Sequence, residues 1–271
     1  MTRSRRKRKE LVDRTTGITL FVVGLVLLMA LAGGALWLRK TRVQLATDLC
    51  PATGASAIQM IMIDRSDPIS GQQAQRVRQY INEIKENALP NTRFDVYVFE
   101  GDIKNELRPI LSICKPKRPE DANDLTENRE FIRRRYEGFS TDLNKTIDSL
   151  MTANTLPNSP IIESLRAAAL SSFGPDVTKS IPRHVTLISD MVQNTSSVSH
   201  FRAVPDFSTL AKTINWAAIK PSLHGADVVI LYLLRPGAMR GHAAIQNRGH
   251  EQFWEELILA SDGKLIKIEM I

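Results

Sequence analysis

The sequence has 271 residues, and its 36 Lys and Arg against 29 Asp and Glu give a formal net charge of +7. The basic excess lies at the amino terminus, where residues 1–38 hold seven basic and two acidic side chains, leaving 29 basic and 27 acidic ones for the rest. Binding to nucleic acid requires a basic surface. The near-balanced main part therefore argues against a nucleic-acid partner.

An uncharged apolar run of 22 residues, 17–38, follows the basic segment. As a helix, this run is long enough to cross a hydrocarbon core of ~30 Å. Because the more basic flank of a membrane span stays in the cytoplasm, we expect a basic cytoplasmic tail over residues 1–16 and a transmembrane helix over 17–38. The alternative is a cleaved signal peptide, but its apolar region is shorter, ~7–15 residues, and ends in small residues.

The remaining chain is then expected to lie outside the cytoplasm, with a linker over residues 39–55 and one domain over 56–271. This topology predicts a single-pass protein of the cell inner membrane, with its amino terminus in the cytoplasm and its domain in the periplasm or another extracytoplasmic space. Cys50 and Cys114 both follow the anchor. A disulfide between them, which contributes about 4 kcal/mol in the chain-entropy model, is one interpretation. Two unrelated thiols are the other, because the sequence does not show that they are close.

Strand-like and helix-like segments alternate through the domain. Apolar runs predict strands at 57–63, 92–99, 184–190, 226–234 and 264–271, with a short edge strand within 107–116. Apolar residues spaced three and four apart predict helices after residue 70, over 132–150, 160–173 and 251–260, and near 206–218. Continuous apolar strands are typical of a parallel sheet covered on both faces. The expected fold class is therefore α/β, with three layers and a mostly parallel central sheet.

Two of the buried strands end in a carboxylate. Asp64 follows the first strand, with Ser66 two residues later, and Asp190 follows the strand that begins near residue 184. The carboxyl ends of parallel strands form the edge at which α/β sheets bind ligands. Carboxylate and hydroxyl oxygens are the ligands that hard divalent cations prefer. The alternative for each aspartate alone is helix capping or turn formation.

These segments resemble the three motifs of the von Willebrand factor A domain. The motifs are Asp64-Arg65-Ser66, the loop Asn158-Ser159-Pro160-Ile161, and Ile188-Ser189-Asp190, in the order and spacing of that family. In the family, an Asp-x-Ser-x-Ser loop, a Thr in the second loop and an Asp in the third form a metal-ion-dependent adhesion site. The resemblance implies a three-layer, Rossmann-like fold over the domain.

The resemblance also implies a site for Mg²⁺ or Ca²⁺, with Mn²⁺ also compatible. The ligands would be Asp64, Ser66, Ser159 and Asp190. Pro68 stands where the family has its second serine and offers no side-chain oxygen. Asp67 and Ser70 are weaker substitutes for the missing ligand. Ser70 also has a second expected role, because Ser70 and Gln73 form a capping-box pattern at a helix start.

An ion in such a site keeps an open position that an Asp or Glu of a partner protein can fill. We therefore expect a membrane-anchored domain that mediates protein–protein interaction within an envelope assembly. A structural scaffold with a degenerate metal site is the first alternative, and a metal-assisted hydrolase is the second.

Catalysis finds little support among the five histidines. No Gly-x-Ser-x-Gly or His-x-x-x-His pattern occurs, so we expect no enzyme. His184 opens a buried strand and is expected to be packed. His200, His242 and His250 lie in loop-like stretches, where exposed side chains are expected.

Overall fold

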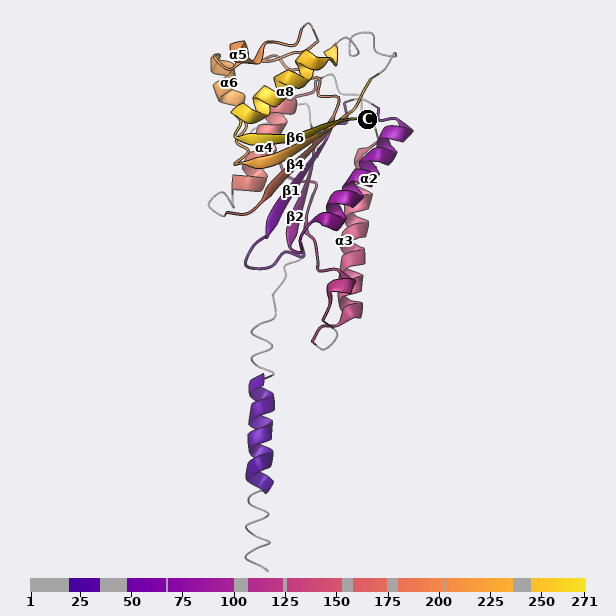
Figure 1. The fold of residues 1–271 in the computed structure, drawn as a ribbon, viewed down its shortest axis with the longest axis vertical. Coiled ribbons are helices and arrows are strands. Elements are labelled where there is room, and N and C mark those ends of the chain that lie inside the picture. Colours follow the sequence, from indigo (N-terminus) through magenta and orange to yellow (C-terminus); the bar gives the residue numbers. More distant parts are fainter. Residues whose placement is uncertain are drawn as a thin grey trace, which may run out of the picture. The chain divides into compact units, whose positions relative to one another are not determined.

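The computed structural model describes residues 20–34, 48–66, 68–99, 107–123, 126–152, 158–174, 180–201, 203–235 and 245–271. Two compact units, Met1–Gln44 and Leu45–Ile271, make up the chain and are described separately (Figure 1). The cytoplasmic tail expected at residues 1–16 and Asp67 lie outside the described residues, as do most of the expected linker and His242.

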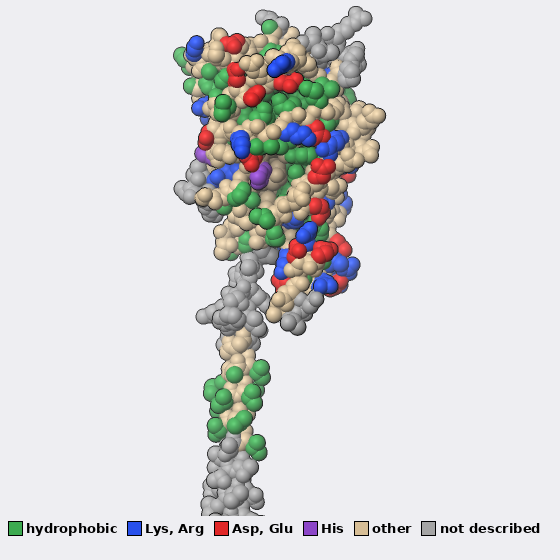
Figure 2. Space-filling model, viewed as in Figure 1, with side chains coloured by type: hydrophobic (Ala, Val, Ile, Leu, Met, Phe, Trp, Pro, Cys, Tyr) green, Lys and Arg blue, Asp and Glu red, His purple; other side chains and the backbone are tan. Residues whose placement is uncertain are grey.

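In the first unit, residues 20–34 form a helix. Its large apolar side chains are exposed along the whole helix, and Figure 2 shows those on the face in view. Residues 17–19 and 35–38 of the predicted transmembrane helix fall outside the described ranges. Within those ranges, no helix combines the length and the apolar character needed to cross a membrane.

The second unit is built on a six-stranded sheet. Its strands are β1 (Ala57–Ile63), β2 (Thr92–Val98), β3 (Leu111–Cys114), β4 (Arg183–Ser189), β5 (Ala226–Tyr232) and β6 (Gly263–Met270). They lie in the order β3-β2-β1-β4-β5-β6, and only β3 runs antiparallel to its neighbour. The mostly parallel α/β sheet expected from the sequence is therefore confirmed. The short, proline-flanked strand lies at an edge, as predicted.

Helices cover both faces of the sheet (Figure 1). One face carries α2 (Gly71–Asn87) and α3 (Arg129–Leu150), and the other carries α4 (Ile161–Phe173), α5 (Phe207–Leu210), α6 (Ile214–Ile219) and α8 (Arg248–Ala260). A short 3₁₀ turn, η1 (Pro119–Asp121), precedes α3. The period-two alternation of β1 explains the two cores, because Ile58, Met60 and Met62 face α4 whereas Ile61 and Ile63 face α2 and α3.

The single helix predicted near residues 206–218 is wrong, because the structure has two short helices there. Asp206 caps α5 by accepting from the backbone N–H of Thr209, and Thr213 caps α6 by accepting from that of Trp216. Each cap satisfies a free N–H of a new helix start, so the chain turns between them.

Cys50 and Cys114 form a disulfide across 64 positions of sequence. The bond joins the segment before β1 to the last residue of β3. The backbone N–H of Cys114 also donates to the carbonyl of Asp48 at 2.9 Å. The edge strand is thus held from both sides, by β2 and by the disulfide.

Candidate functional site

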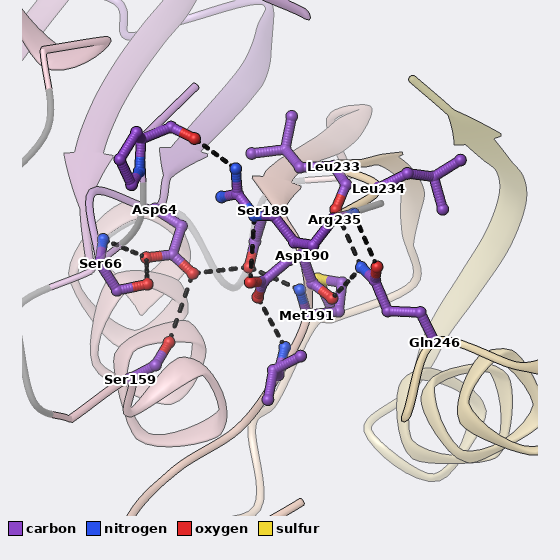
Figure 3. A network of polar contacts seen from close by, with 12 residues as sticks. Asp64, Ser66, Ser159, Ser189, Asp190, Met191, Leu233, Leu234, Arg235 and Gln246 are labelled. Atoms are coloured by element: carbon purple, nitrogen blue, oxygen red, sulfur yellow. Dashed lines mark hydrogen bonds and ion pairs between the residues drawn. The ribbon is translucent and has the colours of Figure 1, made fainter. Parts of the chain in front are cut away.

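The strand order reverses at β1, which lies between β2 and β4. Because the chain leaves β1 toward one side and returns on the other, the carboxyl ends of β1 and β4 lie at a topological switch point. Asp64 follows β1, and its backbone N–H donates to the carbonyl of Ile188 on β4 at 2.8 Å. We call this edge the rim and define it by Asp64, Ser66, Ser159, Ser189 and Asp190 (Figure 3).

Asp64 is the centre of the rim and is only 3% exposed. Its Oδ1 accepts hydrogen bonds from the backbone N–H and the hydroxyl of Ser66, at 2.8 and 2.6 Å. Its Oδ2 accepts from the hydroxyl of Ser189 at 2.7 Å and from that of Ser159 at 3.3 Å. One buried carboxylate therefore gathers donors from three separate loops, and these donors replace the water that the charge loses on burial.

Ser189 is a rim residue that the sequence prediction did not include. Its hydroxyl donates to Asp64 and accepts from the backbone N–H of Met191 at 2.8 Å. The available signal was its position as the last residue of a buried strand, directly before Asp190. Successive side chains along a strand point in opposite directions, so Ser189 and Asp190 contact different groups at the rim.

The second and third loops are tied to each other as well as to Asp64. Ser159 and Asn194 exchange backbone hydrogen bonds of 3.2 and 2.9 Å. The side-chain oxygen of Gln193 accepts from the backbone N–H of Ile162 at 3.0 Å. This contact satisfies a free N–H at the start of α4, where Pro160 provides no side-chain cap.

Asp190 is 2% exposed and belongs to a different set of contacts. Its Oδ1 accepts from the backbone N–H of Val192 at 2.9 Å, and its Oδ2 pairs with Nε of Arg235 at 3.4 Å. The guanidinium of Arg235 also donates through Nη1 to the backbone carbonyl of Pro68. Arg235 thereby connects the third loop to the first.

The side chain of Gln246, which follows Arg235 in the sequence, binds the backbone of this arginine. Its Nε2 donates to the backbone carbonyls of Asp190 and Leu233, at 3.1 and 2.9 Å, and its Oε1 accepts from the backbone N–H of Arg235 at 3.0 Å. Neither Arg235 nor Gln246 was predicted from the sequence. Arg235 did carry a signal, because it follows the apolar β5 run much as Asp64 and Asp190 follow theirs.

Ser70 lies outside the rim contacts and serves as a helix cap. Its hydroxyl accepts from the backbone N–H of Gln73 at 3.3 Å, and the side chain of Gln73 accepts from the backbone N–H of Ser70 at 3.0 Å. The predicted capping box is thus confirmed. Asp67, the other substitute ligand, falls outside the described residues.

These contacts test whether the rim fits the divalent ion that the family resemblance implies. Hydroxyls of Ser66 and Ser159 do meet Asp64, as such a site requires. The carboxylate of Asp190, however, is paired with a guanidinium, and the carbonyl of Pro68 accepts from the same group. With Arg235 in this position, the residues do not fit an ion shared by Asp64 and Asp190.

Two histidines expected to be exposed are instead fully buried. His200 and His250 contact each other through Nδ1 and Nε2 at 3.0 Å, and Nε2 of His250 contacts the carbonyl of Met191 at 3.0 Å. Burial and, as a smaller effect, the neighbouring His250 together lower the pKa of His200 to about 3. Burial likewise lowers the pKa of His250 to about 4. The pair therefore packs neutral between α8, which carries His250, and the loop that carries His200, and it contacts the residue that follows Asp190.

The expectation for His184 was also wrong. It pairs with Asp227 at 3.9 Å with both side chains 44% exposed, because each lies at the open amino-terminal end of its strand. Since neither position lies near a rim serine in the sheet register, the exposed pair is unrelated to the rim.

Comparisons with known proteins give weak similarities only. No family model matches the chain, and no curated protein sequence matches it. Among solved structures, an aerotolerance-related membrane protein from Bacteroides fragilis is 15% identical, covers 79% of this chain and 92% of its own, and has a TM-score of 0.34. The human COPII-coat protein Sec24c is 12% identical, with 80% of this chain and 30% of that chain covered, also at a TM-score of 0.34. The α/β architecture described above rests on this chain's own strand order.

Proposed function

We propose that this chain is a membrane-tethered, non-enzymatic protein of a cell-envelope assembly, whose von Willebrand A-like unit binds another protein at the rim. One observation carries the proposal: polar side chains from three loops meet on Asp64 at the switch point of the sheet. Sheets of this class bind their ligands at that point.

The hydroxyl contacts favour binding over hydrolysis. A nucleophilic serine needs a base positioned to take its proton. Ser66, Ser159 and Ser189 all donate to the one carboxylate of Asp64, so these three serines share a single acceptor and none has a base of its own. The buried histidines contact the backbone of Met191 and each other rather than these hydroxyls. The rim is therefore built as a fixed polar surface.

Three features support a membrane tether with the globular unit outside the cytoplasm. The helix over residues 20–34 exposes apolar side chains all round, a pattern suited to lipid or to the inside of a protein core. The basic residues that precede it favour a cytoplasmic amino terminus. The Cys50–Cys114 disulfide belongs in an oxidising compartment. A reporter fused after Ile271 tests this topology, and a cytoplasmic signal would reverse it.

A metal-dependent form of the same function is the second candidate. In it, Mg²⁺, Ca²⁺ or Mn²⁺ would sit beside Asp64 and recruit an Asp or Glu of the partner. The converging hydroxyls of Ser66 and Ser159 favour this candidate because hydroxyl oxygens of these two loops are metal ligands in the family. It requires Arg235 to leave Asp190.

Site-specific photocrosslinking tests the proposed partner surface. A photoreactive residue is placed at Asn158, which is exposed beside Ser159, in the full chain in its own membrane. The matched control places it at Lys264, exposed at the amino-terminal end of β6 and so at the opposite edge of the sheet. We expect one defined adduct from Asn158 and none from Lys264.

Two further results would decide against the proposal. Adducts at both positions, or at neither, would leave the unit as a scaffold without a partner at the rim. An adduct at Asn158 that a chelator abolishes would favour the metal-dependent candidate instead.

A further inference from the structure

We propose that the guanidinium of Arg235 takes the place of a divalent ion at the rim. The rim is therefore independent of metal. This inference concerns the same site as the proposed function and replaces the ion in it. It does not depend on a partner, so either proposal can fail while the other holds.

The guanidinium of Arg235 lies between two loops of the rim, and this position is the first support for the inference. Arg235 joins Asp190 of the third loop to Pro68 of the first loop, the two loops that an ion would bridge in the family. Pro68 is also the residue that stands in place of the missing serine ligand. The missing ligand hydroxyl and the arginine contact thus coincide at one residue.

The charge balance between Asp190 and Arg235 is the second support for the inference. An unpaired carboxylate as buried as Asp190 would be costly, and an arginine neutralises it permanently because its guanidinium stays protonated. The arginine side chain is itself only 10% exposed. A divalent ion beside this fixed positive charge would meet repulsion in a poorly screened place. The wild-type rim should therefore reject the ion.

The arginine is also held in place by contacts that do not involve its charge. Gln246 accepts from its backbone N–H and donates to the carbonyl of Leu233 on one side and of Asp190 on the other. These bonds fix the start of the side chain at the carboxyl end of β5. The guanidinium is therefore a positioned group rather than a loose surface charge.

Thermal unfolding of the full chain in detergent micelles tests the inference. Wild type is compared with the double variant Arg235→Ala/Pro68→Ser in chelator, in millimolar Mg²⁺ and in millimolar Mn²⁺. This variant frees Asp190 and restores a hydroxyl at the missing ligand position. We expect no shift in the wild-type Tm, and a rise of about 5 °C for the variant when the ion far exceeds its dissociation constant.

Matched variants separate this effect from general destabilisation. Arg78→Ala removes an exposed Arg–Asp pair from α2 and α3 and should gain no response to metal. Arg235→Lys/Pro68→Ser keeps a positive charge at the rim and should also gain none. If the alanine variant fails to fold, Arg235→Gln/Pro68→Ser replaces it with a neutral side chain of similar length.

Either of two results would overturn the inference. A wild-type Tm raised by metal and restored by chelator would show that the arginine does not exclude the ion. Absence of a metal response in a folded double variant with a neutral side chain at position 235, alanine or glutamine, would show that the arginine's charge is not what replaces the ion. In either case the crosslinking at Asn158 reports separately on the partner surface.

Discussion

Two buried aspartates of this protein pair with arginines, one in the middle of a strand and one at the rim. Asp95 on β2 pairs with Arg93 at 3.0 Å and accepts from the hydroxyls of Ser112 on β3 and Ser172 on α4, at 2.7 and 2.8 Å. Arg93 also donates to the carbonyl of Ser172 at 2.6 Å. Strands and a helix supply every one of these partners.

Asp190 at the rim makes the same kind of pair under other conditions. Its arginine lies 45 positions along the chain, and its carboxylate also accepts from the backbone N–H of Val192 in the loop after β4. The Asp95 cluster therefore fastens β2 to β3 and α4, whereas the Asp190 cluster fastens loops at the carboxyl edge of the sheet. The same carboxylate–guanidinium pair can therefore hold the core together or hold loops in place, depending on whether strands and helices or loops supply the partners.

The largest expected effect comes from removing each aspartate in turn. We expect Asp95→Ala to lower the free energy of unfolding by about 3 to 5 kcal/mol, the usual cost of leaving a buried partner charge unpaired. Asp190→Ala should cost less, because its ion pair is longer, 3.4 Å against 3.0 Å for Asp95, and because Asp95 also accepts from the hydroxyls of Ser112 and Ser172. Urea unfolding of both variants measures the difference, with Asp227→Ala as an exposed control. Equal losses at Asp95 and Asp190 would contradict the distinction.

Reduction of the disulfide should act on one cluster only. The Cys50–Cys114 bond holds β3, which supplies Ser112 to Asp95. We expect reduction to cost about 4 kcal/mol of stability in the chain-entropy model. Hydrogen exchange should quicken in β2 and β3 before it does at the carboxyl end of β4. The Cys50→Ser/Cys114→Ser variant is the control and should not respond to reductant; uniform acceleration would argue against a local effect.

Acid should weaken the region behind the rim. Because folding lowers the pKa of His200 to about 3 and that of His250 to about 4, the unfolded state binds more protons below pH ~6.5. Stability is therefore complete above pH ~6.5 and falls as the pH drops toward those values. The loss is about 2 kcal/mol for each histidine by pH ~5.

Denaturant unfolding between pH 7 and pH 4 measures this loss. His224→Gln is the control, because that side chain lies outside the buried pair. A stability profile that is flat over this range would contradict the neutral packing of the two histidines.

The smallest expected effect concerns the hydroxyls around Asp64. Ser66→Ala removes the 2.6 Å hydrogen bond while the backbone N–H of the same residue continues to donate. We expect a loss of about 1 kcal/mol, typical of one hydrogen bond. Thermal unfolding measures it beside Ser70→Ala, which removes only a helix cap. A loss of several kcal/mol from Ser66→Ala alone would mean that Asp64 depends on one donor rather than on three loops.

Local sequence signals predicted most of the fold. β1 occupies the residues that the apolar run indicated, and β2, β4, β5 and β6 lie within a residue or two of their predicted limits. Buried parallel strands are continuous in apolar residues, and the helix from residue 71 begins at a capping box, so both can be seen in a short window. The strand-end carboxylates were visible for the same reason.

The parts that escaped prediction depend on contacts between distant segments. No local pattern links Arg235 to Asp190 or to Pro68, because their pairing exists only after β5 lies beside β4. The same holds for His200 and His250, which meet only once α8, which carries His250, packs against the loop that carries His200. The break between α5 and α6 was missed because the apolar spacing continues across the turn that Thr213 starts.

The central claim is that Arg235, rather than a metal ion, balances Asp190 at the rim. Anomalous diffraction from crystals of the protein grown in Mn²⁺ tests it most directly. We predict no anomalous peak between Asp64 and Asp190, with the guanidinium of Arg235 placed between Asp190 and the carbonyl of Pro68. A manganese peak bonded to both aspartates, with Arg235 displaced, would contradict the account.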